Sequence, residues 1–267
     1  MCLLWLKNIT RLTDMENGYV KSTFIKEGLL EIEFFHPKQN SLPGAILAEL
    51  AQEITKAGEN DDVKVILLKS GGDRTFCAGA SFDELLAIED VVTGKAFFMG
   101  FANVINAMRK APKFILGRVQ GKAVGGGIGV AASTDYCFAT KFASIKLSEL
   151  AVGIGPFVVT PAIERKMGLS AVSQMGINAS EFHSVEFAQA KGLYHQVFDS
   201  VEKMDQAVME LADKLIASNP ESMAQMKKMF WQGTDHWDEL LAERAQISGN
   251  LVTSDFTKSF ISQFKAK

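Results

Sequence analysis

The segment Val119–Gly127 reads VQGKAVGGG, and it ends the apolar run that starts at Phe114. A short apolar run closed by glycines predicts a strand, and the apolar segment Ile128–Ser133 that follows has helical character. Glycines let a ligand approach the backbone closely, and the N-terminus of a helix offers amides without partners. The sequence therefore predicts a strand–loop–helix unit whose main chain can bind a ligand.

A second loop of small residues, Phe76–Ala80 (FCAGA), lies beyond the predicted strand Val63–Lys69. Two backbone amides that face one point would form an oxyanion hole, in which one donor contributes ~3 kcal/mol to transition-state stabilisation. The run Gly125–Gly129 (GGGIG) has neither the spacing of a dinucleotide-binding loop nor a following Gly-Lys-Ser/Thr. Backbone binding of an oxyanion is thus favoured over nucleotide binding at these loops.

Strand and helix signals alternate in the first two-thirds of the chain, and the rest is helical, which predicts an α/β fold. Further expected strands are Tyr19–Ile25, Leu29–Phe35, Tyr136–Ala139 and Ser144–Leu147. Expected helices run from Pro43 toward Gly58, with Ser41 as candidate N-cap, and over Thr93–Arg109, Val158–Lys166, Ala171–Ile177, Val185–Lys191, Met204–Ala217, Glu221–Phe230, Trp237–Ser248 and Asp255–Phe264.

Three regions are expected along the chain: an N-terminal extension of unknown role (1–14), a core (15–200) and a helical C-terminal region (201–267). The C-terminal helices carry many large apolar residues. These residues either pack on the chain's own core or are buried in a subunit interface.

Composition excludes several classes of function. The 267 residues carry a net charge of −3, which gives no support to nucleic-acid or anionic-membrane binding. The three cysteines and four histidines have no metal-ligand or disulfide spacing. The N-terminal apolar stretch is too short to span a membrane. We therefore expect a soluble cytoplasmic protein with no metal, no nucleic-acid partner and no membrane partner.

Several motifs together resemble the crotonase superfamily of enoyl-CoA hydratases and isomerases, over most of the chain from about Tyr19. They are Arg74–Ala80 (RTFCAGA), Val119–Gly127, Asp135, Ser148-Glu149-Leu150 with Gly153-Ile154, the early His36-Pro37-Lys38 with Asn40-Ser41-Leu42, and the late Ala188 to Val197. The resemblance implies a crotonase-like ββα spiral core with a helical C-terminal trimerisation region. It also implies a homotrimer or a dimer of trimers, an acyl-CoA thioester substrate, and no cofactor beyond the coenzyme A that the substrate carries.

The resemblance also implies roles for single residues. The amides of Ala80 and Gly126 would hold the thioester oxygen, and Glu149 would act as general acid and base. Apolar neighbours should raise the pKa of Glu149; the alternative is a solvated loop carboxylate or a helix cap. The residues implied to line the substrate site are Lys38, Ala78, Gly79, Phe82, Gly125, Gly129 and Phe157.

Two positions depart from the pattern of this superfamily. Gly129 stands where hydratases with two glutamates carry the first one, and Phe157 stands where dienoyl-type isomerases add an acid. We expect Gly129 to leave the pocket wider at that wall. Migration of a double bond needs one acid/base group, whereas addition of water is normally served by two. Isomerisation is therefore slightly favoured over hydration with one glutamate, and over an inactive relative that only binds acyl-CoA.

Overall fold

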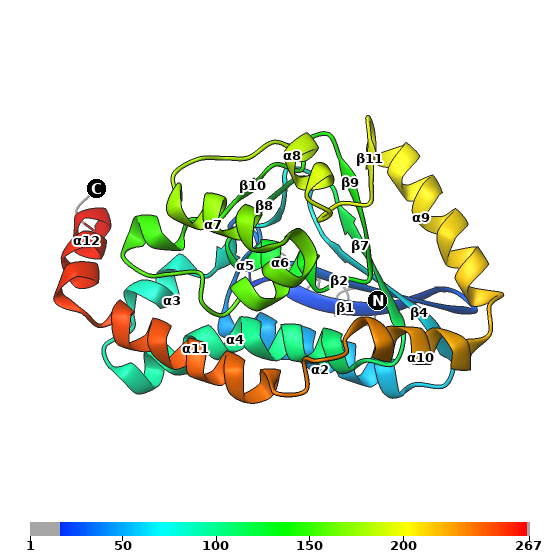
Figure 1. Cartoon of the computed structure of the whole chain (residues 1–267), viewed down its shortest axis with the longest axis horizontal. Helices are drawn as coiled ribbons and strands as arrows, with labels where there is room; N and C mark the ends of the chain where they lie inside the picture. The colour runs from blue at the N-terminus through cyan, green and yellow to red at the C-terminus, as the bar shows by residue number, and fades with distance from the viewer. Residues whose placement is uncertain (1–16, 266–267) are drawn as a thin grey trace, which may run out of the picture.

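The computed structural model describes residues 17–265, so the expected extension 1–14 lies outside the described residues. Its largest sheet is shown in Figure 1 and has the strand order β1-β2-β4-β7-β9-β11. The strands are β1 (Tyr19–Lys26), β2 (Gly28–Phe35), β4 (Val63–Ser70), β7 (Phe114–Val119), β9 (Tyr136–Thr140) and β11 (Gln196–Phe198). β1 and β2 form the expected antiparallel hairpin, and every other pair in the sheet is parallel.

Two small sheets position the glycine-rich loops. One has the order β10-β8-β5, and the other pairs β3 with β6. The strands are β3 (Ser41–Leu42), β5 (Thr75–Cys77), β6 (Gly79–Ala80), β8 (Lys122–Val124) and β10 (Ile145–Lys146). The segment expected to be only a loop of small residues thus contains two short strands, because its backbone pairs with β8 and β3.

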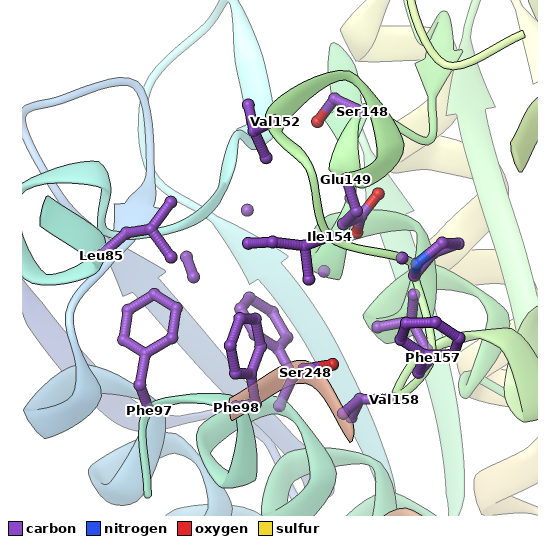
Figure 2. A pocket seen from close by; sticks show the side chains of 18 of the residues that line it. Leu85, Phe97, Phe98, Ser148, Glu149, Val152, Ile154, Phe157, Val158 and Ser248 are labelled. Atoms are coloured by element: carbon purple, nitrogen blue, oxygen red, sulfur yellow. The ribbon is translucent and has the colours of Figure 1, made fainter. Parts of the chain in front are cut away.

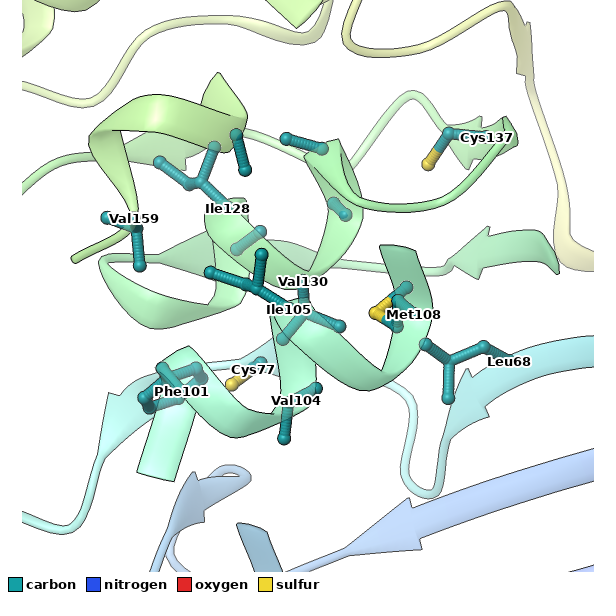
Figure 3. Packing of buried hydrophobic residues seen from close by; sticks show 14 of the residues in the cluster. Leu68, Cys77, Phe101, Val104, Ile105, Met108, Ile128, Val130, Cys137 and Val159 are labelled. Carbon is teal, nitrogen blue, oxygen red and sulfur yellow. The ribbon is translucent and has the colours of Figure 1, made fainter. Parts of the chain in front are cut away.

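The main core lies between these sheets and the helices α2 (Gly44–Glu59), α4 (Val91–Lys110) and α5 (Gly126–Ala132). Figure 3 shows Ile105 and Met108 of α4 close to Ile128 and Val130 of α5. By length and composition α4 could cross a membrane, with a mean hydropathy of 1.2. In the structure α4 packs instead against α2 and against α11 (Trp237–Val252), so its apolar residues serve the core.

The expected N-cap at Ser41 is wrong. α2 begins at Gly44, and Pro43, with an extended backbone, occupies the N-cap position without a side-chain cap. Ser41 belongs to β3 instead, and its hydroxyl donates to the carbonyl oxygen of Ala80 at 2.9 Å. This serine therefore ties β3 to the FCAGA segment rather than capping a helix.

The helical C-terminal region packs largely on the chain's own core. After the short helices α3 (Phe82–Leu86) and η1 (Glu149–Val152), the chain forms α6 (Thr160–Met167), α7 (Leu169–Ile177), α8 (Val185–Ala190), α9 (Val201–Ile216), α10 (Pro220–Phe230), α11 and α12 (Asp255–Lys265). α9 covers one face of the large sheet through Met204, Val208 and Ala212, and α11 lies along α4 (Figure 1). Met229 and Phe256 stay exposed, and trimerisation through this region remains a prediction.

Asp135 anchors α10 to the sheet. Its Oδ2 accepts from the amide of Ile115 at 2.7 Å and from Nζ of Lys227 at 2.8 Å, and its Oδ1 accepts from Nε1 of Trp231 at 3.3 Å. The Lys227 side chain is 2% exposed, so this is a buried ion pair. Asp135 therefore has a structural role, away from the glycine-rich loops.

Candidate active site

The two loops of small residues converge because they follow adjacent parallel strands. β5 pairs with β8, with Thr75 opposite Lys122 and Cys77 opposite Ala123. Beyond these strands the two segments run so close together that a Cβ at position 127 would lie 2.5 Å from the carbonyl oxygen of Cys77. Only glycine fits there, so the spacing of small residues in the sequence builds this contact.

Gly126 begins α5, and Ala80 lies in the facing segment. The first amides of a helix have no partner within the helix, so the Gly126 amide is available to a ligand. A Cβ at Gly79 would stand 3.8 Å from that amide nitrogen, which shows how near the two loops are. The ring of Phe101 covers Gly126 so closely that a Cβ there would lie 2.4 Å from the ring. Ala80 and Gly126 line one cavity.

The carboxylate in this cavity belongs to Glu149, which is the first residue of the 3₁₀ helix η1. Its Oε1 lies against Gly125, where a Cβ would come within 2.8 Å, and Gly125 has a φ of +52° that favours glycine. Oε2 is buried and has no hydrogen-bond partner in the part of the chain that the structure describes. Burial raises the pKa of Glu149 to about 7, opposed in part by the amides of Glu149 and Ser148.

This environment confirms the expected rise in the pKa of Glu149 and does not fit a solvated loop carboxylate. A pKa near 7 lets one carboxyl group accept and return a proton at neutral pH. The loop that holds it ends at Gly153, whose carbonyl oxygen accepts from the Thr257 hydroxyl at 3.0 Å. α12 therefore fastens the segment that carries Glu149.

The cavity beside Glu149 has a volume of about 360 Å³ and mostly apolar walls. Figure 2 shows Phe97 and Phe98 on one side of it and Glu149 on the other. Its larger apolar side chains include Phe82, Leu85, Phe97, Phe98, Phe101, Val152, Ile154, Phe157, Val158 and Val159. Glu149 is the one titratable residue among the described residues that line it. Such a site suits an apolar group bound next to a single acid/base.

Most of the residues expected at the substrate site line this cavity. They are Ala78, Gly79, Ala80, Phe82, Gly125, Gly126, Glu149 and Phe157. Lys38 does not line it. Its ammonium group pairs with the carboxylate of Asp83 in an exposed ion pair beside α3.

Gly129 does not line the cavity either, and the expected widening of the pocket at that wall is wrong. Gly129 is buried, and a Cβ there would lie 2.6 Å from Cγ1 of Val159. Val159 thus fills the space that the absent side chain would take. The glycine allows close packing of α5 on the start of α6, rather than a larger pocket.

Sequence reasoning missed several residues of the cavity, among them Phe97, Phe98 and Ser248. Phe97 and Phe98 come from α4, and Ser248 comes from α11. The only signal for the two phenylalanines was their place in an apolar helix, which predicts burial but no site. Nothing in a single sequence points from Ser248 to loops more than 90 residues earlier in the chain.

The described residues offer no clear basis for a metal site or for a cysteine nucleophile. Among the described residues, no group of three His, Cys, Asp or Glu side chains is placed to bind a metal ion. Burial raises the pKa of the Cys77 thiol to about 12, so this thiol stays protonated near neutral pH and is a poor nucleophile. Cys77 packs in the core (Figure 3).

Comparison with known proteins identifies the family of this chain. Residues 24–265 match the model of the family described as enoyl-CoA hydratase/isomerase. The short-chain-enoyl-CoA hydratase of Clostridium acetobutylicum is 26% identical over 246 residues, which are 91% of this chain and 93% of that protein. The carnitinyl-CoA dehydratase of Escherichia coli strain K12 is 27% identical over 215 residues, or 76% of each chain.

Solved structures show the same fold. An enoyl-CoA hydratase from Bacillus halodurans superposes with a TM-score of 0.85 at 17% identity, over 92% of this chain and 99% of that one. An enoyl-CoA hydratase from Bacillus anthracis superposes with a TM-score of 0.74 at 23% identity, over 92% and 96% of the two chains. These superpositions confirm the expected α/β fold of the crotonase type.

Proposed function

Because the chain belongs to the enoyl-CoA hydratase/isomerase family, we propose that its cavity holds the acyl group of a CoA thioester while Glu149 moves a proton beside the carbonyl. The observation that carries this proposal is the position of Glu149. Its carboxyl group has a pKa of about 7 and lies against Gly125, next to the Gly126 amide, in an otherwise uncharged cavity.

In the proposed reaction the thioester oxygen accepts hydrogen bonds from the amides of Ala80 and Gly126. The Glu149 carboxylate removes a proton from C2 of a 3-enoyl ester, and the electron pair of the broken C–H bond moves toward the oxygen. The two amides stabilise the resulting dienolate. Glu149 then returns the proton to C4, which leaves the double bond between C2 and C3. One carboxyl group is enough for this migration.

Hydration of a 2-enoyl ester is the second candidate, and the names of the relatives favour it. The proteins of C. acetobutylicum and E. coli are a hydratase and a dehydratase. In this chain Glu149 alone would have to activate the water and protonate C2, because Val159 fills the space at Gly129. A protein that binds acyl-CoA without turnover is a third candidate, motivated by the same missing glutamate.

The proposal includes the binding of the coenzyme A moiety and the assembly of the protein. The loop of Lys38 would contact CoA, whose phosphates would compete with Asp83 for the ammonium group. The protein would act in the cytoplasm as a homotrimer or a dimer of trimers, without a cofactor. Light scattering would test the assembly, and a monomer would contradict it.

The decisive experiment compares a 3-enoyl-CoA and a trans-2-enoyl-CoA of equal chain length, with products separated by chromatography and Glu149→Gln as the blank. Conversion of the 3-enoyl ester to the 2-enoyl ester without hydration supports the isomerase. Hydration of the 2-enoyl ester identifies a hydratase instead. If neither ester reacts, a CoA-ester binding measurement decides whether the protein only binds acyl-CoA.

A further inference from the structure

Ser248 places a hydroxyl group without a partner in the apolar cavity. The residue is 1% exposed and lines the cavity, and its Oγ is buried with no hydrogen-bond partner among the described residues. A serine inside a helix commonly bonds to the carbonyl oxygen four residues earlier, which here belongs to Arg244. Ser248 makes no such bond, so its hydrogen-bonding capacity is left for a group inside the cavity.

The packing of α11 on α4 holds Ser248 in this position. A Cβ at Gly249 would lie 2.7 Å from the amide nitrogen of Lys95, and a Cβ at Gly94 would lie 3.0 Å from Cα of Gly249. The two helices can approach so closely only because both positions are glycine. In Figure 2 Ser248 lies near Phe98 and Val158, at the end of the cavity away from Glu149.

We propose that Ser248 determines acyl-group specificity by hydrogen-bonding a neutral polar group, such as a hydroxyl or a carbonyl, at the distal part of the acyl chain. The inference rests on the proposed function, because it assigns the acyl group to this cavity. A serine hydroxyl both donates and accepts, so either group can pair with it. A carboxylate is disfavoured because no cationic side chain lines the described cavity.

The rest of the wall explains why one hydroxyl can discriminate between substrates. The side chains around Ser248 offer only apolar contact to an acyl chain, so a plain alkyl group gains burial but leaves the serine hydroxyl unpaired. A site built to pair a polar group rejects the analogue that lacks it. We expect the polar ester to bind about 10-fold more tightly than the alkyl ester.

Calorimetric titration with two saturated acyl-CoA esters of equal length, one ending in a methyl group and one in a hydroxyl group, tests this role without turnover. Several chain lengths are compared, because only an acyl chain of the right length brings its terminal group to Ser248. The variants are Ser248→Ala, Ser248→Thr, which keeps a hydroxyl, and Thr253→Ala, which removes a hydroxyl from the same end of α11 outside the cavity. Thermal unfolding checks that each variant is folded.

The expected result is a preference for the hydroxyl ester in the wild type, in Ser248→Thr and in Thr253→Ala, and a loss of that preference in Ser248→Ala. Equal binding of both esters to the wild type, or a preference that survives in Ser248→Ala, would overturn the proposed role of Ser248. The proposed function would still stand, because both esters bind. If neither ester binds, the proposed function fails and the role of Ser248 fails with it.

Discussion

Val159 occupies the space beside Gly129. Its Cγ1 would lie 2.6 Å from a Cβ at position 129, and Cδ1 of Ile105 would lie 3.6 Å from it. The position at which the family resemblance implies the first of two glutamates is therefore closed by an aliphatic side chain. Glu149 is the only acid in the described cavity, and the proposed proton transfer depends on its protonation.

The rate of proton transfer should rise with pH and level off above about 7. Glu149 must be ionised to remove a proton, and burial raises its pKa to about 7. The pH dependence of kcat/KM reports this pKa in the free enzyme. We expect the rate to fall about tenfold for each pH unit well below 7, while binding of a saturated acyl-CoA changes little. An acidic limb near pH 4.5 would show that Glu149 is solvated.

Glu149→Gln should stabilise the protein at alkaline pH. The folded state binds the Glu149 proton more tightly than the unfolded state, so the free energy of unfolding falls as pH rises from about 4.5 to about 7. Above pH 7 the ionised carboxylate costs the folded state about 1–3 kcal/mol, the upper value corresponding to the whole shift and the lower one allowing for partial solvation. Glutamine is neutral at every pH and avoids this cost.

Urea unfolding of the wild type and of Glu149→Gln at pH 5 and pH 8 measures the difference. We expect nearly equal stability at pH 5 and a more stable variant at pH 8. The same variant should have lost turnover by a factor of about 10²–10⁴. A variant that is less stable than the wild type at pH 8 would contradict the buried, unpaired state of Oε2.

Removing one partner of the Asp135–Lys227 pair should destabilise the fold without changing the chemistry of the cavity. Lys227→Met leaves the Asp135 carboxylate buried with only its amide and indole donors, and such a loss costs about 3–5 kcal/mol. Asp135→Asn combined with Lys227→Met removes both charges and should cost less than Lys227→Met alone. Equal destabilisation by the single and double variants would show that the charge is not the cause.

The sequence predicted the elements with strong local patterns and missed the features that depend on packing. The hairpin around Gly28 and the apolar strand of Val63 follow from alternation and β-branched residues, and both are present. α9 begins at Val201 rather than Met204, because Ser200 caps it ahead of the first buried apolar residue. Ser41 has the residue type of a helix cap, yet its strand pairing with the FCAGA segment determines its role.

The candidate site could be predicted where backbone and chain order determine it. Gly126 and Glu149 could be expected because the motifs that contain them resemble those of the enoyl-CoA hydratase/isomerase family. The effect of Gly129 could not be predicted, because Val159 reaches it from a helix about 30 residues later. Ser248 was also out of reach, because the Gly94–Gly249 helix contact that positions it exists only in the folded chain.

A glutamate at position 129 should fit only when Val159 is made smaller. Gly129→Glu alone forces a side chain into Cγ1 of Val159 and buries a carboxylate, so it should cost at least about 1–3 kcal/mol. Gly129→Glu/Val159→Ala removes the contact with Cγ1, and only Cβ of residue 159, 2.8 Å from the new Cβ, still has to shift. The two substitutions should therefore couple favourably by about 0.5–3 kcal/mol in urea unfolding. Gly129→Glu/Val158→Ala is the matched control, because the atoms nearest to a Cβ at position 129 belong to Val159 and Ile105 and not to Val158, and it should show no such coupling.

The same variants test how the closed wall limits the reaction. If the new carboxylate reaches the cavity, one group can activate water while the other protonates C2. Chromatography should therefore detect more hydration of the trans-2-enoyl ester by Gly129→Glu/Val159→Ala than by the wild type or by the Val158→Ala control. Suppose instead that Gly129→Glu alone is as stable as the wild type and hydrates the trans-2-enoyl ester as well as Gly129→Glu/Val159→Ala does. Val159 is then no barrier to a glutamate at position 129, and the absence of a second carboxylate from this site has another cause.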